Sequence, residues 1–154
     1  MTLNNTESRG QEYMKLLFVC TGNTCRSPMA EALARLLLDK MGRDDIIVES
    51  AGIFASGEQA TAAAVGVMAE CGMDIQGRRS RQLTASMCCE SDVIAVMTPS
   101  HASIVHHQFN VPREKIRLLG DGIPDPFGGD VALYRQTRDV LLQAVTTLLE
   151  TLAQ

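Results

Sequence analysis

The chain has 154 residues, 45% of them hydrophobic, and its formal net charge is −4 at pH 7. This length and composition suit a single domain with one sizeable core and leave little room for a second one. The basic residues are scattered except in Arg78-Arg79-Ser80-Arg81, so we expect no nucleic-acid partner, and no apolar run reaches the roughly eighteen residues that a membrane span needs.

The first residues are polar and lack any helical or strand period. We expect residues 1–12 to form a disordered leader and residues 13–154 to form the single domain. The chain contains five cysteines, an odd number without the spacing of a secreted disulfide framework, and its N-terminus lacks a signal-peptide stretch. We therefore expect a reducing compartment, the cytoplasm.

The most informative stretch is a strand, a tight loop and a helix start within thirteen residues. Leu16–Val19 form a short apolar strand that ends at Cys20, and Ser27-Pro28 is typical of a helix N-terminus with proline in its first turn. Between them, Gly22-Asn23 tolerate unusual backbone angles, and five residues separate Cys20 from Arg26. That length lets amide N–H groups converge on a tetrahedral oxyanion, with the helix dipole behind them, and so predicts a phosphate-binding loop.

Cys20 and Arg26 suit phosphoryl transfer. The helix N-terminus and the neighbouring guanidinium favour the thiolate form of Cys20, which makes it a nucleophile at neutral pH. Arg26 offers a planar fork of donors that can hold two oxygens of the transferring group and stabilise the charge of its transition state. Ser27 can donate a hydrogen bond to the sulfur and so make it a better leaving group when a phosphocysteine is hydrolysed.

The segment after this loop predicts a βαβ unit. Apolar residues at helical spacing continue from Met29 to Met41, Gly42 ends the helix, and Ile46–Val48 form a second buried strand. A right-handed crossover makes the two strands parallel. It also places Cys20 at a carboxyl strand end, where open α/β sheets bind ligands.

Two helices are expected before the third strand. The first follows the capping-box pair Ser56 and Gln59, and its apolar face includes Cys71, so we expect Cys71 in the core. The second covers Thr84–Glu90, after a basic loop over Gly77–Gln82. We interpret its cysteines as packing residues, Cys88 and Cys89.

The C-terminal half supplies two more apolar strands, Val93–Met97 and Lys115–Leu119. Between them Thr98-Pro99 opens a helix that carries all three histidines, which we interpret as solvated or hydrogen-bonded rather than catalytic. A loop rich in Gly, Asp and Pro, Gly120–Asp130, precedes a last helix over Val131–Leu152. The pattern predicts an α/β domain with a four-stranded parallel sheet flanked by helices.

Asp125 lies in that last loop, between Pro124 and Pro126. The two prolines stiffen its backbone, so its carboxyl group can be held over the Cys20 pocket with little loss of entropy. On composition alone, an ordinary turn aspartate is the more common interpretation. The residues themselves leave both interpretations open.

Cys20 and Cys25 could instead be structural thiols or half of a zinc site. A tetrahedral site needs further ligands at suitable spacing, whereas Cys71 stands alone and Cys88-Cys89 and His106-His107 are adjacent pairs. We therefore expect no bound metal and no other cofactor.

Three motifs together resemble the low-molecular-weight protein tyrosine phosphatase family. Val19–Glu31 reads Val-Cys-Thr-Gly-Asn-Thr-Cys-Arg-Ser-Pro-Met-Ala-Glu, like that family's phosphate-binding loop. Ser50-Ala51-Gly52 and Asp125-Pro126-Phe127 match its Ser-Ala-Gly and Asp-Pro-aromatic motifs, so the similarity covers roughly residues 14 to 152. A bare Cys-x5-Arg is a weak signal, but the full loop with a downstream Asp-Pro is specific.

The resemblance implies a three-layer αβα fold, for which we expect the sheet order 2-1-3-4, and a metal-independent phosphatase that forms a phosphocysteine intermediate. Cys20 would be the nucleophile, Arg26 would bind the phosphate, and Asp125 would be the general acid that protonates the leaving group and later activates water. The expected substrate-binding residues are Thr21, Gly22, Asn23, Thr24, Cys25, Ser27, Phe54 and Phe127, with Ser50 in support.

Thr24 decides which substrate we expect. Tyrosine phosphatases of the family usually carry a bulky aliphatic or other non-threonine residue there, and aromatic residues follow their Asp-Pro motif. This chain has Thr24, Phe54, Phe127-Gly128-Gly129 and the segment Tyr134–Asp139, a combination that resembles the bacterial protein-arginine phosphatases. A small hydroxyl permits a phosphorylated guanidinium, whose charge Asp125 could pair. In the alternative interpretation Thr24 only fills the loop and phosphotyrosine is the substrate.

In either case we expect phosphorylated proteins as partners and a monomeric enzyme. Thioredoxin-coupled arsenate reductases share the Cys-x5-Arg loop but need two further cysteines at and after the end of the third strand, and Met97–Val105 contains none. A non-catalytic phosphate-binding module would have lost Cys20, Arg26 or Asp125, and all three are present.

Two features concern support and regulation of the loop. Many family members carry a histidine before the basic loop that helps to hold Asn23, whereas this chain has Arg78, so we expect the polar network there to be closed differently. Cys25 lies five residues after Cys20 and could capture its sulfenic acid as a disulfide. This predicts reversible inactivation by peroxide.

Overall fold

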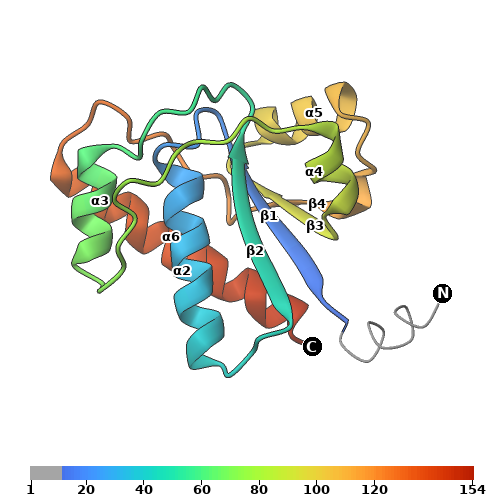
Figure 1. The fold of residues 1–154 in the computed structure, drawn as a ribbon, viewed down its shortest axis with the longest axis horizontal. Coiled ribbons are helices and arrows are strands. Elements are labelled where there is room, and N and C mark those ends of the chain that lie inside the picture. The colour runs from blue at the N-terminus through green and yellow to red at the C-terminus, as the bar shows by residue number, and fades with distance from the viewer. Residues whose placement is uncertain (1–11) are drawn as a thin grey trace.

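The computed structural model describes residues 12–154, and a parallel sheet lies at its centre (Figure 1). The strands are β1 (Met14–Cys20), β2 (Ile46–Gly52), β3 (Val93–Val96) and β4 (Ile116–Leu118). β1 pairs with β2 and β3, and β3 pairs with β4, always in parallel. The resulting order, β2-β1-β3-β4, confirms the predicted four-stranded sheet.

Helices cover both faces of the sheet, which confirms the predicted three layers. The helices α2 (Arg26–Lys40), α3 (Ala62–Ala69) and α6 (Val131–Leu152) lie on one face (Figure 1). On the other face lie α4 (Ala85–Glu90) and α5 (Pro99–Gln108). A short 3-10 helix, η1 (Arg113–Lys115), leads into β4.

The side chains of β1 divide between two cores, because successive residues of a strand point to opposite faces. Leu16 and Phe18 pack on the side of α2 and α6, and Leu17 and Val19 on the side of α4 and α5. All four are at most 1% exposed, and burying each such side chain is worth about 1.5–3 kcal/mol. This packing fixes the central strand and therefore the position of Cys20 at its end.

The segment Tyr134–Asp139, which resembles the arginine phosphatases, has a packing role in the fold. Arg135 and Arg138 of α6 both form ion pairs with Glu70 at the end of α3, with N–O distances of 2.9 and 2.7 Å. Hydrogen bonds from Arg135 and then Arg138 lower the pKa of Glu70 to about 2. These two arginines join α3 to α6.

The predicted capping box at Ser56 and Gln59 is wrong. The helix α3 follows Thr61, whose hydroxyl accepts a hydrogen bond from the amide of Ala64 at 3.3 Å. Gln59 instead forms an antiparallel bridge with Arg79. Backbone groups of Gly57, Glu58 and Ala60 are therefore already paired with the basic loop, and the helix begins only after them.

Two of the predictions for the cysteines are also wrong. Cys71 is exposed, because α3 ends at Ala69 and the helical face does not continue to it. Cys88 is buried as expected, but its neighbour Cys89 in the short helix α4 is exposed. A pattern of apolar residues predicts a buried face only as far as the helix extends.

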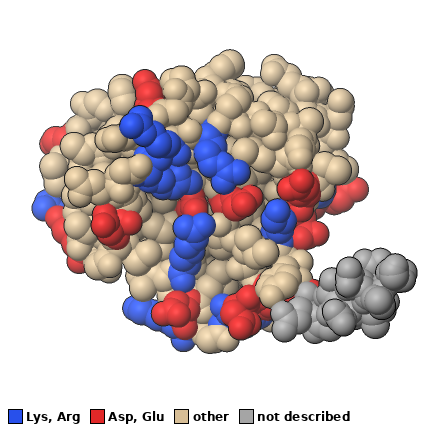
Figure 2. Space-filling view, in the orientation of Figure 1, with Lys and Arg blue, Asp and Glu red and all other residues tan. Residues whose placement is uncertain are grey.

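The predicted leader lies outside the described residues except for Glu12, so it stays a prediction, as does the single domain over residues 13–154. None of the helices within residues 12–154 combines the length and the apolar character that a membrane span requires. In Figure 2, Lys and Arg atoms gather over the course of the loop between α3 and α4, which carries Arg78, Arg79 and Arg81, and acidic side chains are scattered around them.

Candidate active site

The loop between β1 and α2 borders a cavity of about 220 Å³ at the carboxyl end of β1. Nine residues line it: Cys20, Thr21, Gly22, Thr24, Cys25, Arg26, Glu58, Asp125 and Phe127. Eight of the nine are site residues predicted from the sequence, drawn together from two parts of the chain. The ninth, Glu58, is not among the predictions.

The backbone of the loop turns several carbonyls outward and one amide, that of Asn23, toward the sulfur of Cys20. The carbonyl oxygens of Cys20, Thr21 and Thr24 accept hydrogen bonds from amides of the segment that follows β2, at 3.0, 2.8 and 3.0 Å respectively. Asn23 has a φ of 57°, a left-handed conformation that asparagine tolerates. Its amide N–H donates to Cys20 Sγ at 3.2 Å. Carbonyls that face outward leave amides free to face an anion in the cavity.

Gly52 lets the end of β2 approach this loop closely. It lies beside Cys20 in the register of the sheet. A Cβ atom at this position would lie 2.7 Å from the carbonyl oxygen of Thr21 and 2.9 Å from the amide nitrogen of Asn23. Because both neighbours are backbone atoms, no side chain fits, which gives the Ser-Ala-Gly motif a steric reason.

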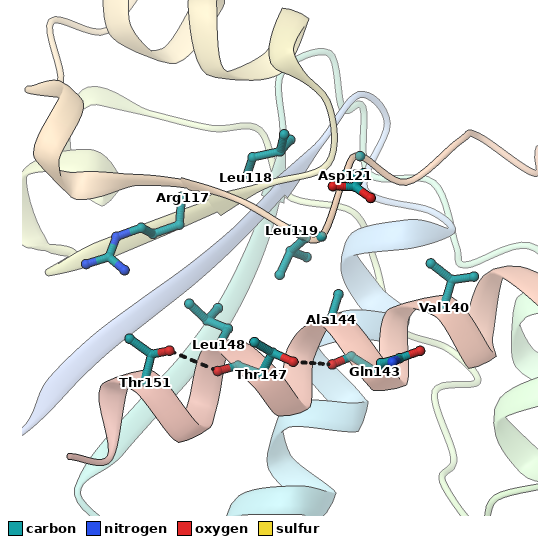
Figure 3. Close-up of a pocket in the computed structure, with 12 residues that line it drawn as sticks. Arg117, Leu118, Leu119, Asp121, Val140, Gln143, Ala144, Thr147, Leu148 and Thr151 are labelled. Atoms are coloured by element: carbon teal, nitrogen blue, oxygen red, sulfur yellow. Dashed lines mark hydrogen bonds between the residues drawn. The ribbon is translucent and has the colours of Figure 1, made fainter.

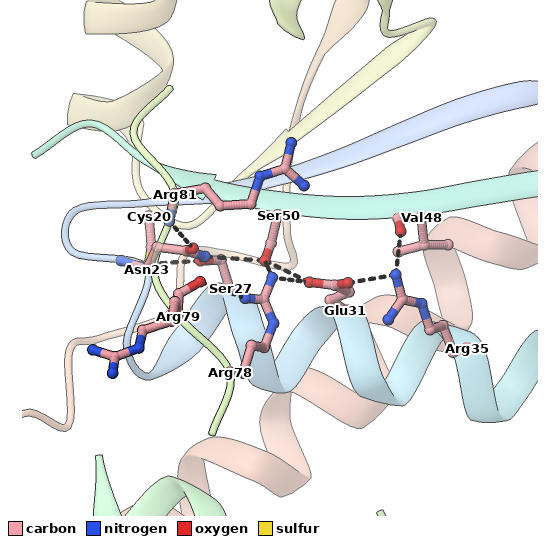
Figure 4. A network of polar contacts seen from close by, with 10 residues as sticks. All are labelled: Cys20, Asn23, Ser27, Glu31, Arg35, Val48, Ser50, Arg78, Arg79 and Arg81. Carbon is pink, nitrogen blue, oxygen red and sulfur yellow. Dashed lines mark hydrogen bonds and ion pairs between the residues drawn. The ribbon is translucent and has the colours of Figure 1, made fainter. Parts of the chain in front are cut away.

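A chain of hydrogen bonds behind the loop ends at the sulfur of Cys20 (Figure 4). Asn23 Nδ2 donates to Ser27 Oγ at 2.7 Å and to Ser50 Oγ at 3.0 Å, while Asn23 Oδ1 accepts from the amide of Arg81 at 2.9 Å. Ser27 Oγ lies 2.9 Å from Cys20 Sγ. Since Ser27 already accepts from Asn23, its own hydrogen is available to a thiolate.

Arg78 closes the far end of this network. It donates to both Ser50 Oγ and Glu31 Oε1 (Figure 4). Ser50 in turn donates to Glu31 Oε1 at 2.6 Å, and Arg35 forms an ion pair with Glu31 Oε2 at 2.6 Å. A carboxylate that is only 5% exposed is thus held between two guanidinium groups. Arg78 thus takes the place where the family resemblance implies a histidine, and it closes the network through Glu31 and Ser50.

Arg26 connects the loop to the segment that carries Asp125. It is 4% exposed, and its Nη1 donates to the carbonyl oxygen of Ile123 at 2.9 Å. Its Nη2 lies 3.5 Å from Asp125 Oδ2. Asp125 Oδ1 also accepts from the amide of Phe127 at 3.1 Å. The acid and the arginine therefore face the same cavity from separate elements.

Two side chains that were not predicted to contact the loop support it from behind. His101 of α5 is 6% exposed, and its Nε2 lies 2.8 Å from Thr21 Oγ1. Burial, and next the charge of Arg26, lower the pKa of His101 to about 4. Tyr134 Oη lies 3.3 Å from both Cys25 Sγ and Thr61 Oγ1, and burial raises the pKa of Tyr134 to about 12. His101 was interpreted correctly as hydrogen-bonded, but its partner was not foreseen.

The predicted residues that lie outside the cavity divide into two groups. Asn23, Ser27 and Ser50 are buried behind the loop and belong to the network that reaches the sulfur. Phe54 does not line the cavity, and its side chain is 74% exposed. Its role in substrate binding stays a prediction.

A second and larger cavity, of about 620 Å³, lies between β4 and α6 (Figure 3). Leu118 and Leu119 border it on one side, and Ala144 and Leu148 of α6 on the other. None of the twelve described residues that line it is a cysteine or a histidine. Size alone would favour this cavity, but the smaller one brings Cys20, Arg26 and Asp125 together, so we take the smaller one as the candidate active site.

Comparisons with known proteins show the family to which the chain belongs. The chain matches the family model "Low molecular weight phosphotyrosine protein phosphatase" over residues 15–154. It is 38% identical to a protein-arginine-phosphatase of Bacillus subtilis over 143 residues, which cover 88% of this chain and 94% of that protein. It is 33% identical to the low molecular weight protein-tyrosine-phosphatase PtpB of Staphylococcus aureus, with 88% of this chain and 96% of PtpB covered.

A solved structure of the arginine phosphatase YwlE, a mutant with a phosphorylated active-site serine, superimposes with a TM-score of 0.86 at 37% identity. The match covers 92% of this chain and 97% of the YwlE chain. The chain therefore belongs to the low molecular weight phosphotyrosine protein phosphatase family and is a phosphatase of that family.

Proposed function

We propose that this phosphatase removes phosphate from phosphoarginine side chains of proteins through a phosphocysteine intermediate on Cys20. The observation that carries the proposal is the composition of the cavity. It brings Cys20, Arg26 and Asp125 together and has the hydroxyl-bearing Thr24, rather than a bulky aliphatic residue, in its wall. Two relatives that share more than a third of their residues with this chain are named protein-arginine-phosphatases.

In the first step the thiolate of Cys20 attacks phosphorus and the bond from phosphorus to the leaving nitrogen breaks. Arg26 and the loop amides stabilise the charge on the equatorial oxygens. Asp125, protonated at this stage, gives its proton to the leaving guanidine nitrogen. The hydrogen bond from Ser27 to the sulfur keeps the thiolate available before the attack.

In the second step water attacks the phosphocysteine and the sulfur–phosphorus bond breaks. Asp125, now a carboxylate, accepts a proton from this water, and inorganic phosphate leaves. The hydrogen bond from Ser27 stabilises the departing sulfur anion. In the related YwlE mutant an active-site serine carries the phosphoryl group, which supports a covalent route for the family.

The experiment compares the turnover of a phosphoarginine peptide and a phosphotyrosine peptide of the same flanking sequence, in the parent chain and in Thr24→Ile. We expect the parent to prefer phosphoarginine and Thr24→Ile to reverse the preference, because a methyl-rich side chain excludes a polar guanidinium and its water. Thr151→Ile, an exposed position of α6, is the matched control. Equal or faster turnover of phosphotyrosine by the parent would contradict the proposal.

A phosphotyrosine phosphatase is the second candidate function, and Phe127 favours it. This side chain lines the cavity and is 69% exposed, so an aromatic ring is available to stack on a phenol. PtpB of Staphylococcus aureus, a relative of similar coverage, is named for this activity. Replacing Phe127 with Leu should then reduce turnover of phosphotyrosine more than turnover of phosphoarginine.

A further inference from the structure

We propose that Glu58 is the residue that binds the guanidinium of the substrate, an inference that rests on the proposed phosphoarginine activity and specifies how it is achieved. Glu58 lines the catalytic cavity with Asp125, and no other acidic residue does so within the described chain. No hydrogen bond or ion pair of its carboxylate occurs within residues 12–154, so its charge is available to a ligand. It lies in the segment between β2 and α3, outside the motifs that identify the family.

The backbone around Glu58 is held firmly in place. The carbonyl oxygen of Glu58 accepts from the amide of Ser80 at 2.7 Å, and the amide of Gly57 donates to Ser80 Oγ at 2.9 Å. On the other side, the amide of Ala60 donates to the carbonyl oxygen of Arg78 at 3.2 Å. The basic loop therefore holds this wall of the cavity in place. This gives a structural role to Arg78-Arg79-Ser80-Arg81, a motif that the catalytic steps do not use.

The same wall is joined directly to the phosphate-binding loop. The amide of Thr61 donates to the carbonyl oxygen of Thr24 at 3.0 Å, three residues after Glu58. The backbone that carries Glu58 is thus tied to the loop that would hold the phosphoryl group. A backbone that is fixed in advance loses little entropy when the substrate binds.

The charges of the cavity and of the leaving group give Glu58 a role that differs from that of Asp125. Asp125 must be protonated to act as the general acid, so in the first step it cannot also neutralise a cation. The leaving group of phosphoarginine departs as a guanidinium, whereas that of phosphotyrosine is a neutral phenol. Glu58 is then the second carboxylate of the cavity, beside the leaving group. It stabilises the cationic leaving group and gives the phenol no comparable advantage.

The test uses Glu58→Gln in the full chain, with the phosphoarginine and phosphotyrosine peptides of matched sequence. We expect kcat/KM for phosphoarginine to fall by about three- to tenfold, the range for a partly solvated charge pair, and kcat/KM for phosphotyrosine to change by less than about twofold. The loss should shrink at high ionic strength, because salt screens an exposed pair. Glu58→Asp should recover part of the loss, since it keeps the charge.

Glu150→Gln removes one negative charge from an exposed position of α6 and is the matched control. Equal losses on both peptides, or no loss on either, would overturn the assignment of Glu58 while leaving the phosphoarginine activity intact. A parent enzyme that cleaves the phosphotyrosine peptide alone would instead refute the proposed function, and the assignment with it. Thermal unfolding of each variant separates these results from a loss of folded protein.

Discussion

The two sides of the phosphate-binding loop differ sharply in burial and in the number of partners. Behind the loop, the support network of Asn23, Ser27, Glu31, Ser50 and Arg78 is connected by hydrogen bonds, and four of these residues are at most 5% exposed. The cavity mouth, defined here as Thr24, Glu58, Asp125 and Phe127, has few internal partners, and Phe127 is 69% exposed.

This difference separates two requirements of the enzyme. A thiolate needs donors that stay in place, and a buried, fully paired network supplies them because breaking any link leaves a polar group unsatisfied. The residues of the cavity mouth contribute little to the free energy of unfolding, so they can differ between enzymes that act on different substrates. Substitutions in the support network should therefore reduce stability and all turnover together, whereas substitutions of Thr24, Glu58 or Phe127 at the mouth should change the preference between substrates.

The largest effect is expected where the two sides meet, at Cys20. Cys20→Ser should reduce turnover of phosphoarginine, phosphotyrosine and generic aryl phosphates by at least about a thousandfold, because the neutral hydroxyl is a far weaker nucleophile. Steady-state kinetics of metal-free protein measures this. Cys71→Ser, which changes an exposed thiol, should leave the rates unchanged. Continued cleavage of an aryl phosphate by Cys20→Ser would refute the mechanism.

The next largest effect tests the support network. Glu31→Gln removes the charge that Arg78 and Arg35 share, and we expect the free energy of unfolding to fall on the order of 2 kcal/mol. Urea titration measures this loss, with Glu150→Gln as the control. Because the change acts on the position of Cys20, kcat/KM should fall by the same factor for both peptides. A change in the ratio of the two rates would show that the network also selects the substrate.

The Cys20–Cys25 pair gives a smaller effect under oxidation. Peroxide should inactivate the parent reversibly, because Cys25 can capture the sulfenic acid of Cys20 before further oxidation. Both thiols are free and buried in the reduced structure. After the same treatment, dithiothreitol should restore most of the parent's activity and much less of the activity of Cys25→Ser. Equal recovery of the two proteins would exclude this protection.

Much of the fold and most of the cavity follow from local patterns in the sequence. The apolar run before Cys20 and the Gly-Asn turn predict a strand and a loop. The phosphate-binding role of this loop can be predicted because residues adjacent in the sequence provide it. Asp125 required the resemblance to a known family, since a proline-flanked aspartate is by itself only a turn residue. The ends of the helices were predicted where caps are strong, as at Thr98-Pro99 and Asp130.

The residues that the sequence did not reveal are those whose role depends on distant partners. Glu58 lies in a stretch that resembled a helix cap, and only its pairing with the basic loop, about twenty residues later, brings it to the cavity. His101 and Tyr134 lie 80 and 109 residues from their partners in the loop. The prediction that Cys71 lies in the core was wrong for a similar reason, because the periodic pattern does not show where tertiary contacts end the helix.

The smallest effect concerns His101 and the dependence of stability on pH. Its pKa is about 4 in the folded protein against an ordinary value of 6.5, so between these values the unfolded chain binds more protons. The stability associated with a neutral His101 is therefore complete above pH 6.5 and is lost as the pH falls toward 4. The thermal midpoint of the parent should drop by a few degrees more between pH 7 and pH 5 than that of His101→Asn, which has no group that titrates there. Exposed His107 offers the control substitution, His107→Asn, which should keep the parent's pH dependence. If His101→Asn and the parent lost the same number of degrees, the proton would have to bind elsewhere, and the contact with Thr21 would not depend on a neutral ring.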